Sequence, residues 1–232
     1  MADVIFSSDV IVNLIRHNAS DDGVIQAAQV SVVGENNPDT VPERLIKALM
    51  KDKHGSPFEH NSVTLFVEAP LFVFREWQRH RIGSFNEMSG RYTEMEPRFY
   101  IPNEERSVIN SGTSMRPEYS VDNVQATALT RMLLTENTRK AWHDYQVMLK
   151  FGVAKEVARM VLPLNIYSQM YWTVNARALM NFISLRVESD DSLVKSYPQH
   201  EIHLGALKVE EIFKQLMPIT YEAFVLNGRV AP

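Results

Sequence analysis

The hydrophobic pattern of the chain predicts three strands. Residues 10–15 form a short apolar run, and residues 61–69 alternate Val63, Leu65 and Val67 with more polar positions before Pro70 ends the run. After Pro163, the segment 165–174 has the same strand-like composition. The alternation over 61–69 predicts a strand with one better-buried face.

Helices are predicted where apolar residues recur every three or four positions. The first helix follows a cap at Asp21 or Asp22, and the second runs from Pro42 to about Lys53. Further helices are predicted over 70–81, from a cap at Asp122 to about Phe151, over 154–161, over 176–187 after a cap at Asn175, and over 199–216. Loops are predicted at 34–44, at 84–92 and over the long stretch 93–120. The pattern predicts an α+β fold in one domain, residues 1–232: a mostly antiparallel sheet flanked by helices.

Composition narrows the class of protein. The net charge is −4, with 24 basic and 28 acidic residues, so the surface as a whole is not expected to attract nucleic acid or anionic membrane. The N-terminal segment lacks the order of a secretion signal and no stretch approaches a membrane span, which favours a cytoplasmic protein. Cysteine is absent, and this excludes disulfides and a cysteine nucleophile.

Against this acidic background, one segment concentrates positive charge. It contains Arg75, Arg79, His80, Arg81 and Arg91. Guanidinium groups bind phosphate with paired hydrogen bonds, so the segment is typical of a site for a phosphorylated small molecule. The alternative is a solvated helix end whose arginines pair with nearby glutamates.

The full spacing around these arginines is RHR-x2-S-x-N-x2-S-x-RY over residues 79–92, and it resembles the signature of the flavin-dependent thymidylate synthases. The resemblance extends to AAQVS (27–31), HGSPFEH (54–60), AKEVARMVLP (154–163) and NARALMNFISLR (175–186). Only 103–125 lacks a family cue, so it is interpreted as a variable insertion.

The resemblance implies reductive methylation of dUMP to dTMP. The carbon donor would be 5,10-methylenetetrahydrofolate, with hydride transfer mediated by FAD and NADPH as the reductant. The absence of cysteine agrees with this route, because the family needs no enzyme thiolate. The resemblance also implies a homotetramer whose sites are shared between subunits.

The resemblance assigns residues to each ligand. FAD would contact Ser31, Ser56, Arg79, His80, Arg81, Glu87, Asn175, Ala176, Arg177 and Asn181. The substrate dUMP would contact Glu76, Trp77, Gln78, Arg79, Glu87, Met88, Ser89, Gly90, Arg91, Arg159 and Arg186. Arg186 would be catalytic, favouring ionisation at N3 of the pyrimidine, and His54 would lie near the flavin and folate.

Several of these residues have simpler explanations. Arg177 and Asn181 at i and i+4 fit a surface hydrogen bond, Arg186 a helix-end charge, and Arg159 an ion pair with Glu156. Ser89 resembles a nucleophile, with His80 as the one obvious base, but is interpreted as a binding residue.

His54, Glu59 and His60 lack a recognised metal-ligand spacing and no further cluster supports one, so no metal is predicted. Two alternative functions also remain at this point: a module that binds single-stranded nucleic acid through the arginines and neighbouring aromatics, and a different flavin or nucleotide enzyme on the same scaffold.

Overall fold

The computed structural model describes residues 3–31, 41–120 and 123–232. It has the predicted α+β fold, with an antiparallel four-stranded sheet and helices. The chain divides into two compact units with interleaved segments. The first unit is Met1–Val10, Glu68–Trp77 and Glu87–Met170, and the second is Ile11–Val67, Gln78–Asn86 and Tyr171–Pro232. The assignment of one domain stays a prediction.

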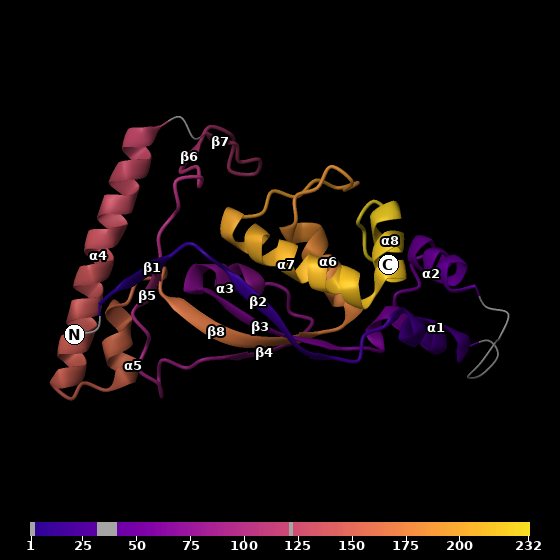
Figure 1. Cartoon of the computed structure of the whole chain (residues 1–232), viewed down its shortest axis with the longest axis horizontal. Coiled ribbons are helices and arrows are strands. Elements are labelled where there is room, and N and C mark those ends of the chain that lie inside the picture. The colour runs from indigo at the N-terminus through magenta and orange to yellow at the C-terminus, as the bar shows by residue number, and fades with distance from the viewer. Residues whose placement is uncertain (1–2, 32–40, 121–122) are drawn as a thin grey trace. The chain divides into compact units, whose positions relative to one another are not determined.

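The first unit is built around one long helix, α4 (Val124–Lys150), which packs against α5 (Lys155–Ala158) and the 3-10 turn η2 (Arg159–Val161) (Figure 1). Asn123 caps α4 by accepting a hydrogen bond from the Ala126 N–H at 2.8 Å, and the helix ends before Gly152, whose φ is +79°. The expected cap Asp122 lies outside the described residues. The carboxyl-terminal half of α4 buries Trp142 and Tyr145, whereas the amino-terminal half leaves most of its apolar side chains exposed.

The remaining elements of the first unit are short. Strand β1 (Ile5–Ser7) pairs in parallel with β5 (Arg98–Tyr100), and β6 (Ile109–Asn110) pairs in antiparallel fashion with β7 (Tyr119–Ser120). Strands β5, β6 and β7 lie in the stretch 93–120 that was predicted to be irregular, and β1 was not predicted. Helix α3 covers only Leu71–Trp77, so the prediction of a helix over 70–81 is wrong beyond Trp77. Arg75 and Arg79 therefore do not share a helix face.

The helices in the described part of the second unit are α1 (Asp21–Gln29), α2 (Pro42–Lys51), α6 (Ala176–Arg186), α7 (His200–Leu216) and α8 (Pro218–Leu226), with the 3-10 turn η1 (Ser56–Glu59). Helix α7 lies against α6 and α8, and α2 packs on α8 (Figure 1). Ser20, not Asp21 or Asp22, caps α1 by accepting from the Gly23 N–H at 3.0 Å. Asp21 instead accepts hydrogen bonds from the N–H groups of Ile219 and Thr220 at the start of α8.

The four-stranded sheet has the order β2 (Ile11–His17), β3 (Val63–Pro70), β8 (Tyr167–Val174) and β4 (Ser84–Glu87). Val63, Leu65 and Val67 of β3 are fully buried as predicted, but Thr64 and Glu68 are buried too, so both faces of this strand are covered. Strand β4 forms where a loop was predicted, because its backbone adds to the edge of the sheet beside β8. The loop predicted at 34–44 lies mostly outside the described residues.

Candidate active site

A cavity of about 340 Å³ opens in the first unit and is lined in part by residues 87–90 of the motif RHR-x2-S-x-N-x2-S-x-RY. This volume is in the range of small-ligand sites. Its polar lining comes from Arg75, Glu87, Ser89, Arg159 and Ser168, and the rest from Leu71, Met88, Gly90, Met95, Leu162 and Ile166. Two cations beside a mostly apolar wall suit a ligand with an anionic group and a flat, less polar ring.

The two cations of this cavity are not neutralised by neighbouring carboxylates. Glu156, the expected partner of Arg159, instead accepts from Arg91, whose Nε lies 2.6 Å from Glu156 Oε2. Neither Arg75 nor Arg159 forms an ion pair with any residue that the structure describes. The interpretation of Arg159 as the partner of Glu156 is therefore wrong, and its guanidinium remains available to a ligand.

Gly90 lets two walls of the cavity approach closely. A Cβ atom at this position would lie 2.7 Å from the Met95 sulfur and 3.4 Å from Cδ of Arg159. A side chain here would push against the Met95 thioether and would make an ordinary contact with Arg159, so glycine leaves room for Met95 in the wall of the cavity. Nearby, the Ser89 hydroxyl accepts from the Arg91 N–H at 3.3 Å, and Ser168 donates to Glu87 at 3.0 Å.

The structure brings five of the predicted dUMP contacts to this cavity: Glu87, Met88, Ser89, Gly90 and Arg159. Arg91 is engaged with Glu156, and the Trp77 side chain is fully buried, so neither lines it. Glu76 does not line it either, while Gln78, Arg79 and Arg186 belong to the second unit. Sequence reasoning missed Ser168, because it sits inside an apolar strand pattern, and left Arg75 out of the substrate set.

In the second unit, the predicted catalytic residue Arg186 is held by His80. Arg186 Nε donates to Nε2 of His80 at 3.0 Å, which requires that this nitrogen carry no proton. Burial, and then the charge of Arg186, lower the pKa of His80 from 6.5 to about 4. His80 is therefore neutral at physiological pH and serves as a hydrogen-bond acceptor.

Aromatic packing fixes the position of this pair. The His80 ring meets Phe182 edge-on with centroids 4.9 Å apart, Phe182 packs on Trp172 at 4.9 Å, and Trp172 stacks with Phe85 at 6.2 Å. A Cβ atom at Gly83 would lie 2.8 Å from the Trp172 indole nitrogen, so the chain after RHR lies close against this ring. Arg79 and Arg81, on either side of His80, are exposed and form no ion pair within the described ranges.

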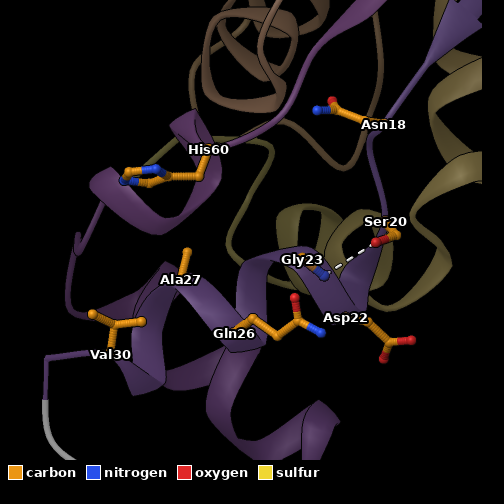
Figure 2. A pocket seen from close by; sticks show the side chains of 8 residues that line it. All are labelled: Asn18, Ser20, Asp22, Gly23, Gln26, Ala27, Val30 and His60. Atoms are coloured by element: carbon orange, nitrogen blue, oxygen red, sulfur yellow. Dashed lines mark hydrogen bonds between the residues drawn. The ribbon is translucent and has the colours of Figure 1, made fainter. Parts of the chain in front are cut away.

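A second hollow, an open cleft of about 630 Å³, lies in the same unit between α1 and His60 (Figure 2). Figure 2 shows one face of α1, with Gln26, Ala27 and Val30, turned toward the cleft that His60 borders from the other side. Ala27 and Val30 belong to AAQVS and His60 to HGSPFEH, so two segments assigned to the flavin line one cleft. Ser31, Ser56 and His54 are exposed and do not line it.

The predicted flavin contacts on α6 are already engaged in structure-forming bonds. Asn175 caps α6 by accepting from the Ala178 N–H at 2.9 Å, and the Ala176 N–H donates to Asn61 at 2.8 Å. Asn181 donates to the backbone oxygen of Arg177 at 3.2 Å, which is the surface hydrogen bond considered above. Arg177 itself pairs with Glu59 at 2.6 Å.

Within the described segments, no three His, Asp or Glu side chains are grouped to hold a metal ion, and no helix is long and apolar enough to cross a membrane. The expectation of no metal stays a prediction.

Comparison with known proteins shows the class to which this fold and site belong. Residues 13–219 match the family model described as thymidylate synthase complementing protein. The chain therefore belongs to the family of flavin-dependent thymidylate synthases.

Individual relatives agree over nearly the whole length. The flavin-dependent thymidylate synthase of Streptomyces avermitilis is 50% identical over 98% of this chain and 95% of its own, and that of Tropheryma whipplei strain TW08/27 is 46% identical over 99% and 98%. A solved structure of the UMP/dUMP methylase PolB from Streptomyces cacaoi, bound with 5-Br UMP, superposes with a TM-score of 0.91 at 41% identity, covering 99% of each chain.

Proposed function

We propose that this protein methylates dUMP at the uracil ring to give dTMP, with 5,10-methylenetetrahydrofolate as carbon donor, FAD as the hydride-transferring cofactor and NADPH as reductant. The observation that carries the proposal is the cavity of the first unit. It unites motif residues Glu87 to Gly90 with Arg75 and Arg159, two cations without a protein counter-ion among the described residues.

The chemistry of this cavity fits a uridine nucleotide. Arg75 and Arg159 supply guanidinium groups for the phosphate, which they bind with charge-assisted hydrogen bonds. Ser89 and Glu87 offer a hydroxyl and a carboxylate to sugar or base, and the apolar wall of Leu71, Met95 and Ile166 accepts the ring faces. No cysteine is present to attack the base, so the residues position the substrate rather than bond to it.

The second unit provides residues that fit a flavin. AAQVS and HGSPFEH, distant in the chain, line one cleft whose amide, hydroxyl and imidazole groups suit a polar cofactor with ribose and ring nitrogens (Figure 2). The exposed Arg79 and Arg81 supply positive charge for a diphosphate. When bound, the flavin supplies the hydride that the protein residues cannot supply.

Arg186 is proposed to stabilise negative charge that develops on the pyrimidine. A guanidinium keeps its charge at any working pH, and the hydrogen bond to neutral His80 fixes the orientation of its plane. A doubly protonated His80 would lose this bond and repel the guanidinium. The lowered pKa of His80 therefore protects the arrangement at physiological pH.

The test is an anaerobic assay on purified protein loaded with FAD. Bleaching of the flavin absorbance by NADPH, followed by formation of dTMP from dUMP once methylenetetrahydrofolate is added, is the expected result. UMP is tested in parallel, because a solved relative is described as a UMP/dUMP methylase. A protein that fails to bind FAD, or that consumes no dUMP under these conditions, contradicts the proposal.

Two arginine variants connect the assay to the cavity. Arg159→Gln removes a cation from the cavity and is expected to raise the KM for dUMP by about 10-fold or more, as the loss of a charge-assisted hydrogen bond does. Arg116→Gln, at an exposed position outside both hollows, is the matched control and is expected to leave KM unchanged. Equal effects of the two variants would argue against phosphate binding at Arg159.

The predicted homotetramer is part of this proposal. Strand β2 is an edge strand of the sheet and exposes Leu14 and Ile15, which supports association through this element. Light scattering during size-exclusion chromatography is expected to give four times the chain mass of 26.6 kDa. A monomer mass at micromolar concentration would refute the assembly.

A further inference from the structure

Arg177, a predicted flavin contact, is held from two sides by its own unit. Its Nη1 atom donates to Glu59 Oε1 at 2.6 Å, and its Nε atom donates to the backbone oxygen of Pro232 at 2.7 Å. The two partners are far apart in sequence, one in η1 and the other after α8. Nη2 forms no bond to the residues that the structure describes, so this nitrogen is available to a ligand.

A third contact limits where the guanidinium can lie. A Cβ atom at Gly55 would be 2.5 Å from Cζ of Arg177 and 2.6 Å from its Nε. The guanidinium therefore lies directly over the backbone of Gly55. The φ of Gly55 is −76°, a value that any residue adopts, so the need for glycine here arises from the arginine and not from backbone strain.

The segment that supplies the Pro232 oxygen is itself firmly anchored. The Arg229 side chain is only 4% exposed and its Nη1 pairs with Glu210 at 2.7 Å. Its backbone oxygen accepts from the Ser184 hydroxyl at 2.5 Å, and Ser184 is on α6, the helix that carries Arg177. The same helix thus fixes both the arginine and the segment that binds it.

Backbone geometry turns this segment back toward α6. Gly228 and Arg229 both have positive φ, +68° and +58°, a conformation that is unusual for arginine. Asn227 closes the turn by donating to the backbone oxygen of Val230 at 3.0 Å. A non-glycine residue held in this region indicates that the surrounding contacts determine the turn.

We propose that residues 227–232 form a positioning segment that, with Glu59 and Gly55, orients the Arg177 guanidinium so that Nη2 contacts the flavin. The inference rests on the proposed function, because it assumes that Arg177 binds the cofactor. It assigns to the segment after α8 a role in cofactor affinity, which neither the motif nor the family signature includes. Arg177 contacts the ligand, and the segment acts through it.

The test measures the dissociation constant of FAD for the full-length protein by quenching of flavin fluorescence, without turnover. Three changes are compared: Gly55→Ala, Glu59→Gln, and a variant that ends at Arg229. Each is expected to raise the dissociation constant about 3- to 10-fold, the effect of a misplaced or lost hydrogen bond. Glu222→Gln, which removes an exposed ion pair with Lys47, is the control and is expected to leave it unchanged.

The decisive measurement repeats these changes in an Arg177→Ala background. If the segment acts through Arg177, the changes have no further effect there, whereas a general loss of structure would weaken FAD binding equally in both backgrounds. Equal effects in both backgrounds overturn the inference. So does an unchanged FAD dissociation constant when the three changes are made in the protein that retains Arg177. If the natural protein binds no FAD in the first titration, the proposed function fails as well as this inference.

Discussion

Replacing His80 with glutamine tests whether a neutral histidine holds Arg186. Glutamine offers an oxygen that accepts a hydrogen bond and does not titrate. The pKa of His80 falls from 6.5 to about 4 in the folded protein, so between these values the unfolded chain binds the proton and the folded chain does not. The natural protein should therefore lose stability as the pH falls through this window, and the variant should lose less.

The magnitude follows from the two pKa values. For one site, the difference between pKa 6.5 and pKa 4 lowers the free energy of unfolding by about 2.4 kcal/mol between about pH 7 and about pH 4.5. His80 is only partly buried, and screening by solvent reduces the expected loss to about 1 to 1.5 kcal/mol. All other groups titrate in both proteins, so the difference between the two isolates His80.

The assay is urea unfolding followed by circular dichroism at both pH values, on the natural protein, His80→Gln and His143→Gln. His143 is an exposed histidine of α4 and is the matched control. We expect the natural protein and His143→Gln to lose about 1 kcal/mol more than His80→Gln on acidification. Equal losses in all three would refute the assignment of a neutral His80 that accepts from Arg186.

Three further substitutions address the cavity and the packing. Gly90→Ala should raise the KM for dUMP about 10-fold in steady-state assays, because its Cβ would displace the Met95 side chain that lines the cavity. An unchanged KM would contradict binding of the substrate beside Met95. Asp21→Ala should lower the free energy of unfolding, measured in urea, by about 2 to 3 kcal/mol, because two backbone N–H groups and the Thr220 hydroxyl lose their acceptor. A loss below about 0.5 kcal/mol would contradict this role. Glu210→Ala should lower the free energy of unfolding by about 3 kcal/mol or more in the same measurement, because Arg229 would remain buried without its counter-ion. An unchanged free energy of unfolding would mean that the Arg229 side chain reaches water.

The sequence predicted the elements whose signals are local. Pro42 and Asn175 begin helices at the expected positions, and Gly152 follows the end of α4, because a fixed φ, a capping side chain and a positive φ act within one turn. The buried positions of β3 were readable from alternation. The pattern does not distinguish buried from exposed apolar positions, because the largely exposed amino-terminal half of α4 has the same periodicity as its buried half.

The motif signal was also readable as sequence, because RHR-x2-S-x-N-x2-S-x-RY is a fixed spacing of unusual residues. The spacing identified the residues of the motif but not the side chains with which they pair. Sequence separation alone favours Arg159, three residues further on, as the partner of Glu156, whereas the folded chain pairs Glu156 with Arg91. No feature of the sequence indicated that Ser168 lines the cavity, because a polar residue in a strand does not show which groups lie opposite it.

The sequence by itself therefore determined the fold class, the family and most of the residues proposed for the site. These properties depend on residue identity and near-neighbour spacing, which the chain carries in one dimension. Only the tertiary structure decided that His80 accepts from Arg186 and that the Pro232 oxygen accepts from Arg177. Such pairings join residues up to 106 positions apart, and their strength depends on burial and distance, which exist only once the chain has folded.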